Sequence, residues 1–325
     1  MDSEKIPTSI LAIDLGGTKI LLGEVTPDGE VLNSKSYPSD TTTQAIALEH
    51  IIRAIHDYKE TVPFIAKEQI AIGIGLVGRV DHERGVWLEI EPGKSHDTAV
   101  KQIIEQAFSL PCGIDNDVAC ATKSELTFGW GASSHNFLYL NVGTGIAAGF
   151  VVNKEYITGS HFNAGEIGHM VVAMDSDVLC GCGRKGCVER LASGLGLHER
   201  IIALQHDYYP TSLIIEEGKR VSADSIFEAA ESGDELCVRV SEEAAQALAS
   251  TIMNLVRVSD PDTIILGGGV TNNMYFLNRI KHYLNPRTMR FVTNGLVFPK
   301  HSPTESGLIG AALAGLEASK SKSQR

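Results

Sequence analysis

Apolar and polar residues alternate along this chain in the patterns of an α/β protein. From residue 8 to residue 38, short apolar runs are separated by turns at Gly16-Gly17 and at residues 27–29. This pattern predicts three strands. Residues 42–58 carry apolar side chains at helical spacing, and the apolar run QIAIGIGLV that follows is predicted to be a buried strand.

The remainder of the first half continues the alternation of helices and strands. Helical periodicity is found near residues 97–108, a short apolar run covers 112–115, and a further helix is predicted from Asp117 onward. The predicted order is therefore βββαβαβα, which is typical of an α/β fold.

A similar order begins again in the second half. The stretch NFLYLNVGTGIAAGFVVNKEYITG predicts three strands around Gly143 and Gly145, and DTIILGGGV supplies a later strand among helices. Because IDLGGT and LNVGTG place glycine turns at equivalent points, we interpret the chain as a duplicated α/β unit. The alternative is two unrelated α/β domains with ordinary tight turns. Near the end, SGLIGAALAGL predicts a helix that packs back onto the first lobe.

The length of the chain supports a division into two lobes. A chain of 325 residues exceeds what one hydrophobic core usually organises, so we expect two lobes with a cleft between them. The predicted small lobe spans 1–117 and is completed by a C-terminal helix at 303–325, and the large lobe spans 118–302. Apolar residues make up 43% of the sequence and charged residues 21%, which is ordinary for a globular protein.

Charge and hydropathy exclude two classes of partner. The formal net charge is −12, whereas a nucleic-acid surface needs clustered Lys and Arg. No stretch approaches the ~20 apolar residues of a membrane span, and the N-terminus lacks the pattern of a signal peptide. We therefore expect a cytoplasmic protein without nucleic-acid or membrane partners.

The glycine turns are candidates for phosphate binding. Asp14 ends a predicted strand, Gly16 and Gly17 permit a turn, and Thr18 and Lys19 follow with hydrogen-bond donors. A single turn of this kind could also be a plain hairpin.

Two further glycine turns favour the phosphate interpretation. Each follows an apolar strand, as expected for a nucleotide held between two lobes. A dinucleotide-binding motif is not indicated, because the first turn leads into a strand instead of a helix. The two turns are Gly143-Thr144-Gly145 and Gly267-Gly268-Gly269.

A histidine and three cysteines form a candidate metal site. His169, Cys180, Cys182 and Cys187 lie within one short segment, and four such ligands suit tetrahedral Zn²⁺. Because protein would fill all four positions, we expect a closed, structural site. The alternative is a loop with reduced free thiols.

The run Asp115-Asn116-Asp117 opens a predicted helix. Asn and Asp are favoured helix N-caps, so capping alone could explain one or two of these residues. In phosphoryl transfer an aspartate can instead accept the proton of the attacking hydroxyl, a contribution on the order of 10² to 10⁴ in rate.

Several motifs occur together in one order: DLGGTK, DND before a helix, GTG, AGEIGH, CGCGRKGCVE and a late GGG strand. From Leu11 to Leu316 the chain thus resembles the ROK family of repressors, open reading frames and sugar kinases. The resemblance implies the duplicated, ribonuclease H-like fold shared by actin and hexokinase. It also implies homodimers or homotetramers and, in kinases, the use of ATP with Mg²⁺.

The resemblance also implies roles for individual residues. Asp117 would be the catalytic base, and Gly267, Gly268 and Gly269 would lie beside the nucleotide. His169 would serve both the metal and the sugar, because an imidazole held by zinc has its other nitrogen oriented. The implied sugar-binding residues are Asn116, Glu166, His169, Glu189 and Gly78. The residues that would hold the phosphates and Mg²⁺ are Asp14, Gly16, Gly17, Thr18, Lys19, Gly143, Thr144 and Gly145.

The function implied by the resemblance is glucokinase-type phosphorylation of a hexose 6-hydroxyl by ATP. The alternative substrate is an N-acetylhexosamine, either N-acetylmannosamine or N-acetylglucosamine. Two non-enzyme alternatives are a catalytically inactive sugar sensor and a sugar-responsive repressor. A repressor of this family carries a DNA-binding domain ahead of the sugar fold, and we expect no room for one before Asp14.

Overall fold

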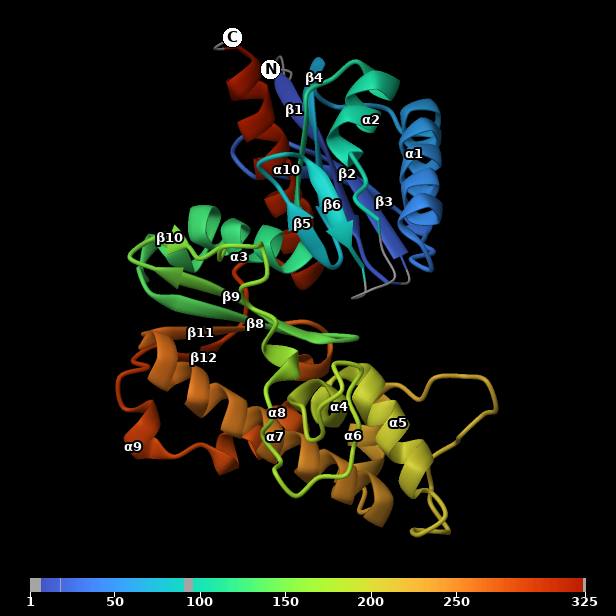
Figure 1. Cartoon of the computed structure of the whole chain (residues 1–325), viewed down its shortest axis with the longest axis vertical. Helices are drawn as coiled ribbons and strands as arrows, with labels where there is room; N and C mark the ends of the chain where they lie inside the picture. Colours follow the sequence, from blue (N-terminus) through green and yellow to red (C-terminus); the bar gives the residue numbers. More distant parts are fainter. Residues whose placement is uncertain (1–6, 18, 91–95, 324–325) are drawn as a thin grey trace, which may run out of the picture. The chain divides into compact units, whose positions relative to one another are not determined.

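The computed structural model describes residues 7–17, 19–90 and 96–323 (Figure 1). The chain divides into two compact units: the first comprises 1–133, 156–164 and 299–325, and the second comprises 134–155 and 165–298. The sequence places the boundary at 117, whereas this division includes helix α3 (Asp117–Phe128) in the first unit. There, α3 packs against the C-terminal helix α10 (Pro303–Ser323).

The first unit is built on a mixed five-stranded sheet in the order β3-β2-β1-β4-β7. The central strand β1 runs antiparallel to β2 and parallel to β4, and β7 is parallel to β4. A small antiparallel pair, β5 and β6, follows β4 and is not predicted from the sequence. The strands are β1 (Thr8–Leu15), β2 (Lys19–Val25), β3 (Val31–Pro38), β4 (Glu68–Leu76), β5 (Arg79–Asp81), β6 (Val86–Glu89) and β7 (Cys112–Asn116).

Helices cover both faces of this sheet (Figure 1). Strand β1 alternates with the two-residue period of a strand: Leu11 and Ile13 belong to the core formed with α1 (Gln44–Thr61) and α2 (Val100–Phe108). Ile10 and Ala12 belong to the core formed with α10. Because both faces of the strand are buried, it reads as an almost continuous apolar run.

Glycines allow α10 to approach the sheet closely. A β-carbon built on Gly73 of β4 would lie 1.8 Å from the Ala311 carbonyl oxygen, and one on Gly113 of β7 would lie 1.9 Å from that of Ala314. No side chain fits at either position without a shift of backbone. The predicted packing of the C-terminal helix onto the first unit therefore depends on these two glycines.

The second unit repeats the plan of the first. Its sheet has the order β10-β9-β8-β11-β12, in which β8 is antiparallel to β9 and parallel to β11, and β12 is parallel to β11. The predicted duplication is thus confirmed. The strands are β8 (Phe137–Val142), β9 (Ile146–Val152), β10 (Glu155–Tyr156), β11 (Thr263–Gly267) and β12 (Gly295–Val297).

The helices of the second unit pack mainly on one face of its sheet. Leu138 and Leu140 of β8, with Ile264 and Leu266 of β11, join the helices in a single apolar core. The helices are α4 (Val188–Ala192), α5 (Gly194–Leu204), α6 (Ala223–Glu231), α7 (Glu235–Ser259), α8 (Met274–Tyr283) and α9 (Pro286–Met289). Short helical turns are η1 (Trp130–Ala132) in the first unit, and η2 (Ile167–His169) and η3 (Val270–Asn272) in the second.

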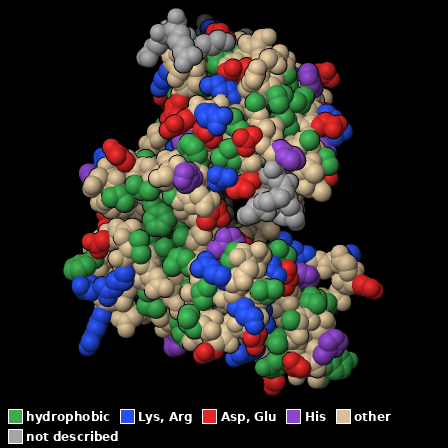
Figure 2. Space-filling model, viewed as in Figure 1, with side chains coloured by type: hydrophobic (Ala, Val, Ile, Leu, Met, Phe, Trp, Pro, Cys, Tyr) green, Lys and Arg blue, Asp and Glu red, His purple; other side chains and the backbone are tan. Residues whose placement is uncertain are grey.

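Charged side chains of both signs are interspersed over the face shown in Figure 2. Within the described ranges, none of the helices combines the length and the hydropathy that crossing a membrane requires.

Candidate active site

The first glycine turn joins β1 to β2 and leaves its backbone open. The Gly16 N–H donates to the Lys19 carbonyl at 2.9 Å, and the Ser39 hydroxyl donates to the Gly16 carbonyl at 2.7 Å. A β-carbon built on Gly17 would have no neighbour within 4 Å. The backbone at Gly17 is therefore accessible, as it must be if a phosphate is to approach the turn. Thr18 lies outside the described residues.

The Asp14 carboxylate lies against Gly307 of α10, where a side chain would collide with it. A β-carbon on Gly307 of α10 would lie 2.5 Å from Asp14 Oδ2, and one on Gly75 of β4 would lie 3.6 Å from Oδ1. Burial raises the pKa of Asp14 from 3.8 to about 6, and the charge of Lys19 opposes this rise. An oxygen ligand beside an open turn suits Mg²⁺, which prefers carboxylates and phosphates.

The Asn116 side chain organises the start of α3. Its Oδ1 accepts the Ala119 N–H at 3.0 Å, which makes Asn116 the N-cap of the helix. Its Nδ2 donates to the Gly78 carbonyl at 2.8 Å and to Asp117 Oδ1 at 2.9 Å. The capping interpretation is therefore confirmed for Asn116, and the same side chain orients the Asp117 carboxylate. Its contact with a sugar remains a prediction.

The backbone conformation at position 78 favours glycine. Its φ is +82°, in the left-handed region that favours glycine. A β-carbon there would also lie 2.2 Å from the Glu89 carbonyl oxygen. Gly78 thus forms the sharp turn after β4 and offers its carbonyl to Asn116.

Asp115 is ion-paired with Lys123 of α3. Its buried carboxylate lies 2.6 Å from Lys123 Nζ. Burial alone would lower the pKa of Lys123, but its attraction to Asp115 and the hydrogen bond between them raise that pKa overall. Because Lys123 stabilises the charge of Asp115, this carboxylate is a poor candidate for a catalytic base.

The second glycine turn is tied to the first turn of α5. Its own backbone closes through the Gly143 N–H, which donates to the Gly145 carbonyl at 3.0 Å. The Gly194 N–H donates to the Gly143 carbonyl at 2.8 Å, and the Leu195 N–H to the Thr144 carbonyl at 3.3 Å. The position of this turn is thus fixed by hydrogen bonds from a helix N-terminus.

The third glycine turn packs against β8. A β-carbon on Gly267 would lie 2.4 Å from the Tyr139 hydroxyl, and one on Gly268, whose φ is +81°, would lie 2.3 Å from the Val142 carbonyl oxygen. Gly269 has no such neighbour within 4 Å. Close packing therefore requires glycine at positions 267 and 268, whereas the space beside Gly269 is open.

Glu189 links the metal-site segment to the second glycine turn. Its Oε2 accepts the Ile146 N–H at 2.9 Å. β-carbons on Gly145 and Gly168 would lie 2.7 and 3.0 Å from the same oxygen. The Glu189 carboxylate thus holds the end of the second glycine turn in place, a role that the sequence does not reveal. Its contact with a sugar remains a prediction. Glu166 lies immediately before η2, the turn that carries His169.

Three of the four predicted metal ligands gather around one point, and Cys187 lies outside that group of three. The ligand atoms of His169, Cys180 and Cys182 all lie within 4.8 Å of one another. His169 Nδ1 is 3.4 Å from Cys180 Sγ, and Cys187 Sγ is 3.6 Å from Cys182 Sγ. Hydrogen bonding from the Arg184 backbone is the main cause that lowers the pKa of Cys182 to about 6. This donor set is consistent with zinc.

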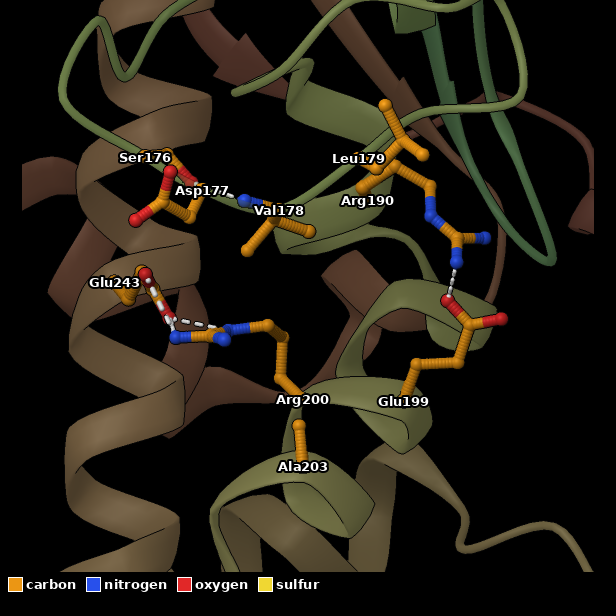
Figure 3. A pocket seen from close by; sticks show the side chains of 9 residues that line it. All are labelled: Ser176, Asp177, Val178, Leu179, Arg190, Glu199, Arg200, Ala203 and Glu243. Atoms are coloured by element: carbon orange, nitrogen blue, oxygen red, sulfur yellow. Dashed lines mark hydrogen bonds and ion pairs between the residues drawn. The ribbon is translucent and has the colours of Figure 1, made fainter.

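A separate hollow lies beside the metal-site loop and contains none of the predicted site residues (Figure 3). Its volume is about 510 Å³. Arg190 pairs with Glu199 in it, and Arg200 pairs with Glu243 at 2.8 Å. Both guanidinium groups are therefore already neutralised by protein, which leaves little affinity for an anionic donor. The residues lining it are Ser176, Asp177, Val178, Leu179, Arg190, Glu199, Arg200, Ala203 and Glu243.

Comparison with known proteins places this arrangement in context. A model of the ROK family matches residues 10–317. A glucokinase of Halalkalibacterium halodurans is 28% identical over 89% of this chain and 88% of its own. An N-acetylmannosamine kinase of Yersinia pestis is 31% identical over 93% of this chain and 97% of its own. The crystal structure of a ROK glucokinase from Streptomyces griseus with glucose and AMPPNP has a TM-score of 0.77 at 27% identity, covering 95% of this chain and 99% of its own.

We expect Asp14→Asn to stabilise the ligand-free protein at neutral pH. The pKa of Asp14 is higher in the folded state, at about 6, than its ordinary 3.8, so ionisation of this group opposes folding as pH rises from 4 through 6. Asn cannot ionise, and its advantage should grow over that window to at most about 3 kcal/mol above it. Urea unfolding between pH 4 and 8 measures this. Equal stabilities at every pH, or a less stable variant at pH 8, would show that the buried charge is not a cost.

Proposed function

The chain belongs to the ROK family, and on this basis we propose that it transfers the γ-phosphoryl group of ATP to a hydroxyl of a hexose. The observation that carries this proposal is the orientation of Asp117 by Asn116 at 2.9 Å, in the unit that also holds Asp14 and the open Gly16-Gly17 turn. A base and a phosphate-binding turn are the parts that phosphoryl transfer needs.

The proposed step uses Asp117 as the base. Its carboxylate accepts the proton of the sugar hydroxyl while the hydroxyl oxygen bonds to the γ-phosphorus. The bond from that phosphorus to the bridging oxygen breaks, and ADP leaves with the electron pair. Mg²⁺, held by Asp14 and the phosphates, would neutralise negative charge on the phosphate oxygens. Backbone N–H groups of the glycine turns would position the donor.

The second unit contributes the proposed sugar ligands Glu166, His169 and Glu189. Glucose, phosphorylated on its 6-hydroxyl, is the first candidate, and an N-acetylhexosamine is the second, since relatives of both kinds match nearly the whole chain. Hydrogen-bonding groups would separate these sugars, because a site with unpaired polar atoms rejects the wrong one strongly.

We also propose that His169, Cys180, Cys182 and Cys187 hold one structural zinc ion. His169 would use Nδ1, the nitrogen that lies beside Cys180, and Nε2 would then be oriented for the sugar. Binding to a segment with little apolar content would stabilise its fold. A homodimer or homotetramer is proposed from the family alone, and sedimentation would test it.

The kinase proposal predicts sugar-dependent release of ADP with ATP and Mg²⁺. We would assay glucose, mannose, fructose, allose, N-acetylglucosamine and N-acetylmannosamine. Asp117→Asn should lower kcat on the accepted sugar by on the order of 10² to 10⁴, the usual contribution of a base. Asp28→Asn is the matched control, since it removes the same charge from an exposed turn of the same unit.

The outcomes of this assay separate the alternatives. Turnover on one sugar that is lost in Asp117→Asn and kept in Asp28→Asn would identify the substrate. If folded, zinc-loaded protein turned over none of these sugars but bound one, the kinase proposal would fail in favour of an inactive sensor.

The zinc proposal predicts about one zinc per purified chain, which is the number that a single four-ligand site holds. Cys182→Ala removes an exposed ligand, and we expect it to lower both the zinc content and the unfolding temperature. Cys237→Ala removes a thiol outside the cluster and should leave the zinc content unchanged. Mass spectrometry of the metal measures this, and equal zinc in all three proteins would contradict the assignment.

A further inference from the structure

Gly194 lies where three segments of the second unit meet. A β-carbon built on it would lie 3.2 Å from the Gly143 carbonyl oxygen, 3.3 Å from Arg220 Nη2 and 3.6 Å from Val270 Cγ2. Gly143 begins the second glycine turn, and Val270 follows the third. The Arg220 guanidinium therefore lies beside both turns that we assign to the nucleotide.

The N-terminus of α5 is already engaged at this point. Its Gly194 and Leu195 N–H groups donate to carbonyls of the second glycine turn at 2.8 and 3.3 Å. They fix the turn and are not available to a ligand in this arrangement. An additional cation beside the turn is thus the group best placed to attract an anion here.

Arg220 provides that cation. Among the described residues, no carboxylate is ion-paired with it. Partial burial lowers the pKa of Arg220 and the charge of Glu199 opposes this, but Glu199 is paired with Arg190. The neighbouring Lys219, in contrast, lies 2.6 Å from Glu216. Arg220 therefore differs from the other cations nearby in having its charge unmatched.

A hollow of about 640 Å³ opens next to Arg220, between α5 and residues 215–220. Its volume falls within the range of pockets that bind small molecules. Leu195 and Ile202 of α5 and Ile215 of the loop give it apolar walls. His198 Nδ1 accepts the Val221 N–H at 3.2 Å and so holds the loop to the helix. The hollow has room and an apolar surface for a nucleoside.

We propose that Arg220 binds the phosphate groups of the nucleotide donor at the Gly143–Gly145 turn, with the nucleoside in the adjoining hollow. The proposal rests on the proposed function and adds a binding residue to it. A guanidinium presents a planar fork of N–H donors that matches two phosphate oxygens. Arg220 would thus complement the uncharged backbone of the turn with a positive charge.

The test is direct titration of ATP with Mg²⁺ into the whole protein by calorimetry, without sugar. We expect Arg220→Met to weaken ATP binding by about 10- to 100-fold, the effect of losing a hydrogen bond to a charged group. Arg220→Lys keeps the positive charge but loses the planar pair of N–H donors, so its ATP affinity should lie between those of the wild type and Arg220→Met. Arg287→Met removes the same charge from an exposed position in α9 of the same unit. It should change affinity less than about 2-fold, because the charge of an exposed group is screened by salt.

Two further readouts exclude a merely structural role for Arg220. In turnover assays Arg220→Met should raise KM for ATP with little change in KM for the sugar, and its unfolding temperature should match that of Arg287→Met. Equal ATP affinity in both variants would overturn the proposal. If ATP binding depends on Arg220 but no sugar is phosphorylated, the proposed kinase function fails and the Arg220 assignment stands.

Discussion

The candidate catalytic residues of the first unit depend on one side chain amide, that of Asn116. It caps α3 through Ala119, holds the turn after β4 through Gly78 and orients the Asp117 carboxylate. A buried or half-buried amide with its donors and acceptor engaged has one low-energy orientation. The ends of β4 and β7, the start of α3 and the proposed base are therefore positioned together, before any ligand binds.

Duplication explains why comparable chemistry is found in both units. In each sheet a central strand is antiparallel to its hairpin partner and parallel to the next strand along, and the hairpin turn is rich in glycine. The two copies have diverged in what surrounds the turn. The first places a partly buried carboxylate, Asp14, beside it, whereas the second holds its turn with Glu189 and α5 and adds the cation Arg220.

The sequence predicts most of the fold, because strand alternation and glycine turns are local patterns. It also predicts that His169, Cys180 and Cys182 lie together, since these residues are close in sequence. The bond from Ile146 to Glu189 could not be predicted, because it joins residues that only the fold brings together. Arg220 lies in a loop that contains no recognisable motif. Only its position beside Gly194 in the folded chain indicates a role for it. The short strands β5 and β6 were not predicted, because segments of three and four residues are too short to show a clear alternation of apolar and polar side chains.

The central claim is that Asn116 acts in catalysis by orienting Asp117. The most direct test is a double-mutant cycle on kcat, with Asn116→Ala, Asp117→Asn and the double variant, measured on the sugar that the wild-type protein phosphorylates. If Asn116 acts through Asp117, the double variant should be no slower than Asp117→Asn alone, because one function has been removed twice. Fully additive losses, together with a raised KM for the sugar in Asn116→Ala, would contradict this account and make Asn116 an independent sugar ligand.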